Sequence, residues 1–401
     1  MTKEVSESSN LLFEWSGEKG TAISVSPDAS LFAVGVSEDR RILLFKKLSD
    51  GWGSYCLPLL SGGEIIRLKL LSQNVLCFLV NGEDSVNFIS WDDEIFKEAS
   101  ERDSVPDVRL SPLCAGAKDA FLERLFGTIH TFDIAQYGSL CWLGYSGKLV
   151  LARIVDVSDS RAHSFSISSY SSFRCSSGTV FALNSCLDGH RVIFSTSEST
   201  SLHMLDVDAS SSFHYSSYNG HSDWITCLKV GEENENLLLS GDSSGQVCFW
   251  DIRCKTSLVG SWAFFRSIAA VDFWRDPWKM MVAFGRHEDY IIEDEEPRHR
   301  GFLFSCVDLR ANMLPPCIME QRPPRGWGED GWTDATTIRH VVSRRTTDDQ
   351  VVAMDTDDRK SRIVYITSEG FIRVSSSEIL DGHHTDPLLH LLSRRELGIL
   401  K

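Results

Sequence analysis

Short runs in which apolar and polar residues alternate recur along the chain, and glycine, aspartate and serine separate them. The clearest group spans residues 220–253, with alternating runs at residues 224–228, 237–241 and 247–251. Alternation with a period of two predicts half-buried antiparallel strands, and a Ser-Ser-Gly segment at residues 243–245 supplies a tight turn between the last two. One such sheet cannot bury both of its faces alone. The group therefore predicts similar sheets stacked beside it in a ring.

This group begins with Gly220-His221 and ends with Trp250-Asp251, and in these residues it resembles a WD repeat. The resemblance implies an all-β chain folded as a WD-repeat β-propeller. It also implies structural roles for His221, Ser240, Trp250 and Asp251. In such a repeat the histidine forms hydrogen bonds with the serine, with the tryptophan and with an aspartate in the following turn, and Asp251 completes the repeat ending. Ser244 stands where that turn aspartate is usually found, so we expect a weakened network.

Weaker alternating groups predict the other blades of the ring. They lie at residues 21–45, 65–92, 129–152, 180–205, 269–307 and 338–374, which with the first group makes a seven-bladed propeller. Trp91-Asp92 repeats the Trp-Asp ending. The last group lacks an outer strand, and we expect residues 11–15 to supply it, because closing the ring removes open sheet edges.

The remaining segments are too polar or irregular for the core, which predicts one propeller domain over residues 11–380 with surface loops between the blades. The expected loops are residues 93–118, 157–177, 288–296 and 315–332. Residues 1–10 are expected to be a disordered N-terminus. Residues 381–401 are expected to form a tail with a short helix, for which Asp386 is the N-cap.

Composition narrows the classes of function. With 401 residues, of which 42% are hydrophobic, the chain can form one large all-β domain. The net charge of -16 argues against binding nucleic acid through the whole surface, because phosphate attraction needs a basic field. The 11 cysteines include no Cys-x-x-Cys pair and suit a reducing compartment. No apolar run is long enough to cross a bilayer, so we expect no membrane contact and a nuclear and cytoplasmic location.

Signals that suggest catalysis have structural explanations. Residues 241–245 match Gly-x-Ser-x-Gly, which in hydrolases exposes a nucleophilic serine between a strand and a helix. Here the next element is a predicted strand, so a structural turn is expected. The histidines match neither His-Glu-x-x-His nor zinc-ligand spacings. We therefore expect no catalytic residue, no cofactor and no metal site.

Three residues are candidates for partner binding. Trp327 and Trp332 lie in a glycine-rich segment, where they either pack on the propeller or act as interface hot spots. Arg253 ends the sequence Trp-Asp-Ile-Arg at residues 250–253. If the tryptophans are hot spots, replacing both with alanine weakens partner recovery without unfolding the propeller.

A closer resemblance is to the non-catalytic WD subunit of the tRNA guanine-N7 methyltransferase, in residues 26–45, 220–250 and 268–274. It implies a protein that is monomeric within a heteromeric complex, stabilises a methyltransferase catalytic subunit, and contacts tRNA only through the complex. In that family, the blade preceding the strong repeat carries a charged, partly basic turn that meets the catalytic partner. The corresponding residues here, 197–201, contain no basic residue.

Two other functions remain open. Residues 250–253 match the Trp-Asp-x-Arg ending of substrate receptors of cullin-RING ubiquitin ligases, although Ser244 departs from the acidic residue expected there. Residues 221–224 and 240–253 are also similar to the WD-repeat methylesterase of diphthamide synthesis. That activity would require a nucleophile and a base.

Overall fold

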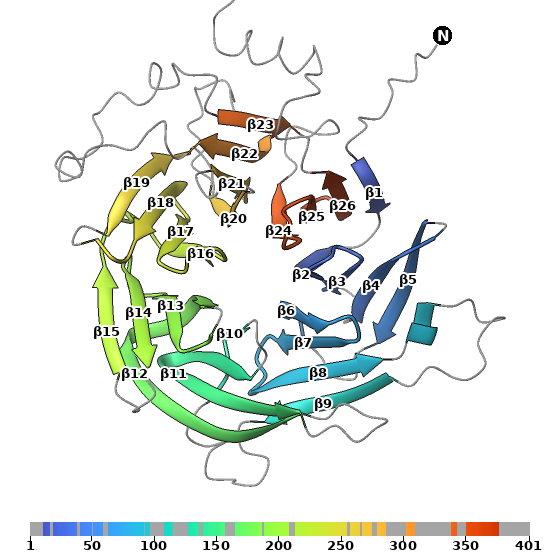
Figure 1. Cartoon of the computed structure of the whole chain (residues 1–401), viewed down its shortest axis with the longest axis horizontal. Coiled ribbons are helices and arrows are strands. Elements are labelled where there is room, and N and C mark those ends of the chain that lie inside the picture. The colour runs from blue at the N-terminus through green and yellow to red at the C-terminus, as the bar shows by residue number, and fades with distance from the viewer. Residues whose placement is uncertain are drawn as a thin grey trace, which may run out of the picture.

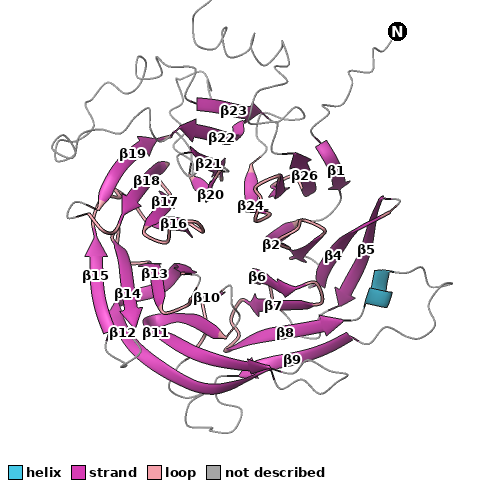
Figure 2. Ribbon diagram, in the orientation of Figure 1, coloured by secondary structure: helices cyan, strands magenta, loops and turns pink. Residues whose placement is uncertain are grey.

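Antiparallel strands arranged around a centre make up almost all of the structure (Figures 1 and 2). The computed structural model describes residues 11–16, 19–37, 41–49, 51–58, 63–91, 93–96, 108–114, 127–135, 139–156, 165–186, 188–207, 213–254, 257–264, 267–274, 279–285, 302–308, 338–342 and 350–376. A short 3-10 helix, η1 (Asp93–Phe96), is the one helical segment within those ranges. No helix in the same ranges is long and apolar enough to span a membrane.

Four of the sheets contain four strands each, in chain order. They are β2 (Gly20–Val25), β3 (Leu31–Val36), β4 (Arg41–Leu48) and β5 (Gly51–Pro58); β6 (Ile65–Ser72), β7 (Val75–Val80), β8 (Ser85–Trp91) and β9 (Val108–Cys114); β16 (Ile225–Val230), β17 (Leu237–Asp242), β18 (Gln246–Asp251) and β19 (Leu258–Ala263); and β20 (Ile268–Phe273), β21 (Lys279–Phe284), β22 (Phe302–Asp308) and β23 (Ile338–Val342). The first strand of each lies nearest the centre (Figure 1).

A fifth sheet has six strands and consists of two four-stranded units. Its strands are β10 (Thr131–Ile134), β11 (Leu140–Asp156), β12 (Phe165–Ser185), β13 (Arg191–Thr196), β14 (Leu202–Val207) and β15 (Phe213–Tyr218). The long β11 folds back on itself at Gly147, whose φ is 71°, so that the Ile154 amide donates to the Ser139 carbonyl at 2.8 Å. β12 pairs with β11 through Thr179 and with β13 from Val180 onward. Each unit therefore has its own inner and outer strands.

The N-terminal strand closes the ring, as the sequence predicts. β1 (Leu11–Ser16) pairs with β26 (Phe371–Ser376), which continues through β25 (Arg362–Thr367) to β24 (Val351–Thr356). Arg373 Nε donates to Glu14 Oε2 at 2.8 Å across this pair. Phe13 packs against Phe45 with ring centroids 5.5 Å apart, and so joins β1 to the core of the next sheet. The last blade thus obtains its outer strand from the start of the chain.

These sheets define an all-β propeller. Seven inner strands follow one another around the described part of the ring: β2, β6, β10, the second half of β12, β16, β20 and β24. Middle strands such as β3, β7 and β17 are buried at every position, because neighbouring sheets cover both of their faces. The hydrogen-bonded sheets formed by the described strands number six, so the count of seven blades stays a prediction, which the succession of inner strands supports.

Three sequence-based assignments were wrong. Residues 338–342 are not the inner strand of the last blade, because β23 pairs with β22 as the outermost strand of the sheet before it. Residues 108–114 form strand β9 inside an expected loop. The serine-rich run 157–177 contains the first part of β12. All three are outer strands, which carry few core residues and therefore a weak apolar pattern.

The other predicted segments lie outside the described residues: the N-terminus at 1–10, the segments 288–296 and 315–332, and the tail at 381–401 with its short helix.

Candidate functional site

A buried hydrogen-bond network joins the strands of the β16–β19 sheet. His221 Nε2 lies 2.5 Å from Ser240 Oγ, and His221 Nδ1 lies 2.9 Å from Asp242 Oδ2. Trp250 Nε1 donates to Ser240 Oγ at 2.7 Å. We call these four residues the His221 network. The side chains of His221 and Asp242 have no exposed surface, and Trp250 is 1% exposed.

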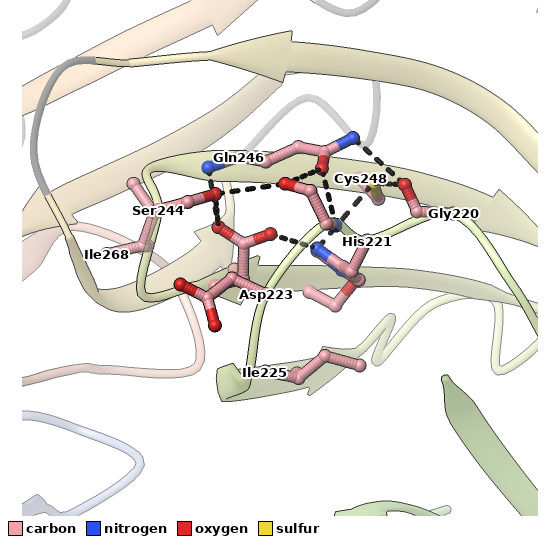
Figure 3. Close-up of polar contacts among 12 residues, drawn as sticks. Gly220, His221, Asp223, Ile225, Ser244, Gln246, Cys248 and Ile268 are labelled. Atoms are coloured by element: carbon pink, nitrogen blue, oxygen red, sulfur yellow. Dashed lines mark hydrogen bonds and ion pairs between the residues drawn. The ribbon is translucent and has the colours of Figure 1, made fainter. Parts of the chain in front are cut away.

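Close backbone packing positions the network. Gly220 precedes His221, and a Cβ at residue 220 would lie 2.8 Å from the Trp250 ring, so glycine is required where the entry loop crosses the indole. Gln246 Nε2 donates to the Gly220 carbonyl at 3.0 Å, which ties this loop to the start of β18. Figure 3 shows Gly220 beside Gln246 and Cys248 of β18, with Ser244 farther away in the turn before this strand.

Asp242, rather than Ser244, is the turn aspartate, so the expectation of a weakened network was wrong. Ser244 instead donates to Asp242 Oδ1 at 2.8 Å, and the Gln246 amide donates to the same oxygen at 2.8 Å. Burial on its own raises the pKa of Asp242. The hydrogen bond and charge of His221, together with the bonds from Gln246 and Ser244, outweigh it and hold that pKa below its ordinary value. The carboxylate is thus stabilised in its charged form.

The contacts among Ser240, His221 and Asp242 resemble those of a catalytic triad, but the surroundings differ. A nucleophilic serine must be reachable by substrate, whereas Ser240 is fully buried and its oxygen also accepts the Trp250 N–H. Both ring nitrogens of His221 are engaged. Residues 241–245, which match Gly-x-Ser-x-Gly, form the turn between β17 and β18, and Gly245 has a φ of 95°. The arrangement is suited to holding strands together.

A second set of polar contacts links the inner strands, each from the equivalent position of one strand to the next. We call them the inner-ring contacts. They join Asp355 to the Val25 amide (2.8 Å), Ser24 to the Leu70 amide (3.0 Å), Lys69 to Asp133, Asp133 to the Ser185 amide (2.8 Å), Asn184 to the Val230 amide (2.8 Å), Lys229 to Asp272 (3.7 Å) and Thr356 to Asp272 (2.6 Å). Together they pass through all seven inner strands.

The inner-ring carboxylates are stabilised by their partners. Burial raises the pKa of Asp133, but Lys69 beside it and the bonds from Ser185 lower it below the ordinary value. Asp272 follows the same pattern, with Lys229 and Lys360 as its cations. Both side chains of the Lys360–Asp272 pair are buried, so removing one of them leaves an uncompensated charge, which costs about 3–5 kcal/mol. These charges therefore hold neighbouring blades together.

The predicted partner-binding residues Arg253, Trp327 and Trp332 and the predicted structural residues Trp91 and Asp92 differ in whether the structure describes them. Arg253 lies after β18, has a side chain that is 58% exposed, and donates from Nη2 to Asp251 Oδ2 at 2.7 Å. Trp91 ends β8 and is 4% exposed, as a structural role requires. Trp327, Trp332 and Asp92 lie outside the described residues.

Two exposed aromatic side chains were not singled out from the sequence. Phe181 is 55% exposed and Trp224 is 61% exposed. The Ala182 amide donates to Ser195 Oγ at 3.3 Å, and Ser195 Oγ donates to the Ile225 carbonyl at 3.2 Å. Phe181 and Trp224 directly precede these bridged residues, so they stand at the same end of neighbouring inner strands. Alternation alone cannot reveal them, because each adjoins buried residues.

Comparison with known families agrees with the fold. The WD domain, G-beta repeat, matches residues 213–251, which contain β15 to β18 and the whole His221 network. This repeat, together with the ring of antiparallel sheets, supports membership of the WD-repeat family. No curated protein matches the chain. WD-repeat propellers serve in general as platforms for protein interaction, so a scaffold role is the function that this match supports.

Proposed function

We propose that the chain is a non-catalytic scaffold that binds a protein partner through the end of the ring marked by Phe181 and Trp224. The observation that carries the proposal is that these two exposed aromatic residues stand at the same end of neighbouring inner strands. Large aromatic residues are costly to leave in water and are enriched among interface hot spots. The rigid ring beneath them fixes their positions, which lowers the entropy lost on binding.

The internal contacts of the charged and nucleophilic groups support the non-catalytic part of the proposal. His221 and Ser240 are committed to their own sheet, and the half-buried Lys69 and Lys229 and the buried Lys360 are paired with carboxylates. Catalysis requires a base and a nucleophile that meet at an accessible point. Incubating the purified chain with a methyl-ester form of elongation factor tests this directly, and turnover that depends on one polar residue would replace the scaffold proposal with an esterase.

Affinity purification from the native cell tests partner binding. We expect the Phe181→Ala/Trp224→Ala double variant to lose most of the partner, since hot-spot residues contribute about 2 kcal/mol or more each. Its melting temperature should match that of the unmodified chain, because both side chains are largely exposed. Leu48→Ala is the matched control, an exposed apolar residue at the end of β4. Equal partner recovery by the double variant and the control would refute the proposed surface.

The finer identity of the partner is also a proposal. We favour an accessory-subunit role in a tRNA guanine-N7 methyltransferase, which rests on the similarity of residues 26–45, 220–250 and 268–274. Most of the second stretch lies within the matched repeat and is shared widely, so the first and third carry the distinction. Co-purification of a methyltransferase that modifies tRNA supports this role, whereas recovery of a cullin-RING adaptor supports the ligase alternative. The free thiols of Cys77, Cys141 and Cys248 suit the nucleus and cytoplasm, where we propose that the complex acts.

A further inference from the structure

An open, largely apolar cavity lies between the outer strands of the two units in the six-stranded sheet. Its volume is about 280 Å³, and Phe173, Phe194 and Leu205 form its floor with Phe213 and Tyr215 at its side. The first part of β12 supplies one wall and β15 supplies the other. We call it the β12–β15 groove. Its volume is just below the 300–1,000 Å³ typical of small-molecule pockets, which suits one large side chain better than a cofactor.

Exposed aromatic surface accompanies the groove. Phe213 is 58% exposed and Tyr215 is 44% exposed, on a strand whose outward pattern is otherwise polar. Phe213 meets Phe173 edge to face, with ring centroids 5.6 Å apart. Tyr215 is fixed by a 2.7 Å hydrogen bond between its hydroxyl and His203 Nδ1. The two aromatic rings are therefore held in place beside the cavity.

The edge of β15 is open within the described part of the chain. β15 ends the strand order of its sheet, and no described strand pairs with its outer side. Such an edge presents unpaired backbone N–H and C=O groups that an extended peptide can join. Side chains of an added strand point alternately to its two faces, so every second one would face the groove.

Charge selects the kind of peptide. Arg174 lines the groove, is exposed, and makes no ion pair with a described residue. Cys175 beside it is neutral at physiological pH, because burial raises the pKa of its thiol to about 12. Arg174 is the charged residue among those that line the groove, and Lys148 lies opposite it in the register of β11 and β12. The groove therefore presents positive charge next to apolar surface, in a molecule of net charge -16.

We propose that the β12–β15 groove binds an extended acidic segment of a protein partner. The segment pairs with the edge of β15, inserts one aromatic or large aliphatic side chain into the cavity, and places a carboxylate against Arg174. This inference rests on the proposed scaffold function but concerns a surface separate from Phe181 and Trp224.

The test is selection of short random peptides displayed on phage against the immobilised full-length chain. We expect enriched peptides to carry an aromatic or large aliphatic residue within two positions of Asp or Glu. Their synthetic forms should lose about tenfold or more in affinity on Arg174→Glu and on Phe213→Ala. They should keep their affinity for Arg359→Glu, a matched exposed arginine in the turn between β24 and β25. Exchanging the acidic residue for lysine should restore binding to Arg174→Glu.

Other outcomes overturn the inference. Selected peptides without an acidic residue, or with equal affinity for the unmodified chain and both groove variants, exclude the groove as their site. A concentration-dependent dimer that Phe213→Ala abolishes would show that a second copy covers it. If groove variants retain the cellular partner while the Phe181→Ala/Trp224→Ala variant loses it, and the selected peptides bind elsewhere, the groove proposal fails and the scaffold proposal stands.

Discussion

In the β16–β19 sheet a polar network joins the middle strands, whereas in the neighbouring unit from β12 to β15 the equivalent positions hold apolar and unpaired groups. The registers fix the comparison: Ser240 pairs with Cys248 across β17 and β18, and Phe194 pairs with His203 across β13 and β14. Trp250 lies two residues after Cys248, and Leu205 lies two residues after His203, so Leu205 occupies the position equivalent to Trp250. The neighbouring unit therefore holds its strands together by aromatic and aliphatic packing.

In the β12–β15 unit, where apolar residues stand at positions of the His221 network, some buried polar atoms have no described partner. The position of Asp242 is occupied by Thr196, whose Oγ1 is buried and has no hydrogen-bond partner among the described residues. His203 Nε2 is likewise buried and unpartnered in that part of the chain, and burial lowers the pKa of its imidazole. Buried polar groups without hydrogen-bond partners lower stability. In the His221 network of the neighbouring β16–β19 sheet, the polar groups have their partners. The comparison shows that one blade geometry accepts either chemistry, and that Phe194 and Leu205 of the apolar version line the β12–β15 groove.

The largest expected effect is at Trp250. Trp250→Ala removes a fully buried indole and leaves Ser240 without one donor, so we expect a loss of about 3–5 kcal/mol in the free energy of unfolding. Urea denaturation measures it. Trp224→Ala serves as the control, because that side chain is 61% exposed and its removal should leave stability nearly unchanged. Similar losses for both variants would contradict the structural role of Trp250.

A matched pair of smaller substitutions tests the difference between the two units. Ser240→Ala leaves His221 Nε2 and Trp250 Nε1 without their common partner, which should cost about 1–3 kcal/mol. Thr196→Val removes a hydroxyl that has no described partner, so stability should stay constant or rise slightly. Thermal melts of both variants decide the matter. A loss at residue 196 as large as that at residue 240 would mean that both units depend on polar bonding.

The elements that the sequence predicted well share a physical cause. β17 and β18 are short, alternate regularly and end in Trp250-Asp251, and closure by β1 follows from the missing outer strand of the last blade. Strand β9 was missed because it contains Pro112, and the first part of β12 because serines dominate it. Both lie at the rim of the ring, where one face needs no apolar side chains.

The candidate site was less predictable for two reasons. Residues 242–244 offer several polar side chains in one tight turn, and only the backbone path shows that Asp242 reaches His221 while Ser244 supports it. Phe181 and Trp224 are exposed because of how two neighbouring sheets are arranged at one end of their inner strands. The alternation of residues along a single strand does not predict that arrangement.

The smallest expected effect is an acid dependence confined to the polar network. The folded-state pKa of Asp242 lies below the ordinary value of 3.8, because His221 and the bonds in the turn stabilise its charge against the cost of burial. A lowered folded pKa contributes stability that is fully present above pH 3.8 and is lost as the pH falls through the folded value.

The Asp242→Asn variant has no carboxylate at this position, so it cannot lose that contribution on acidification. We therefore expect the stability gap between the unmodified chain and Asp242→Asn, about 1–3 kcal/mol near neutrality, to narrow below pH 3.8. Melting temperatures of both proteins between pH 6 and pH 3 measure the gap, with Thr196→Val as the reference that should show no such change. A gap that stays constant over this range would show that the charge of Asp242 does not stabilise the blade.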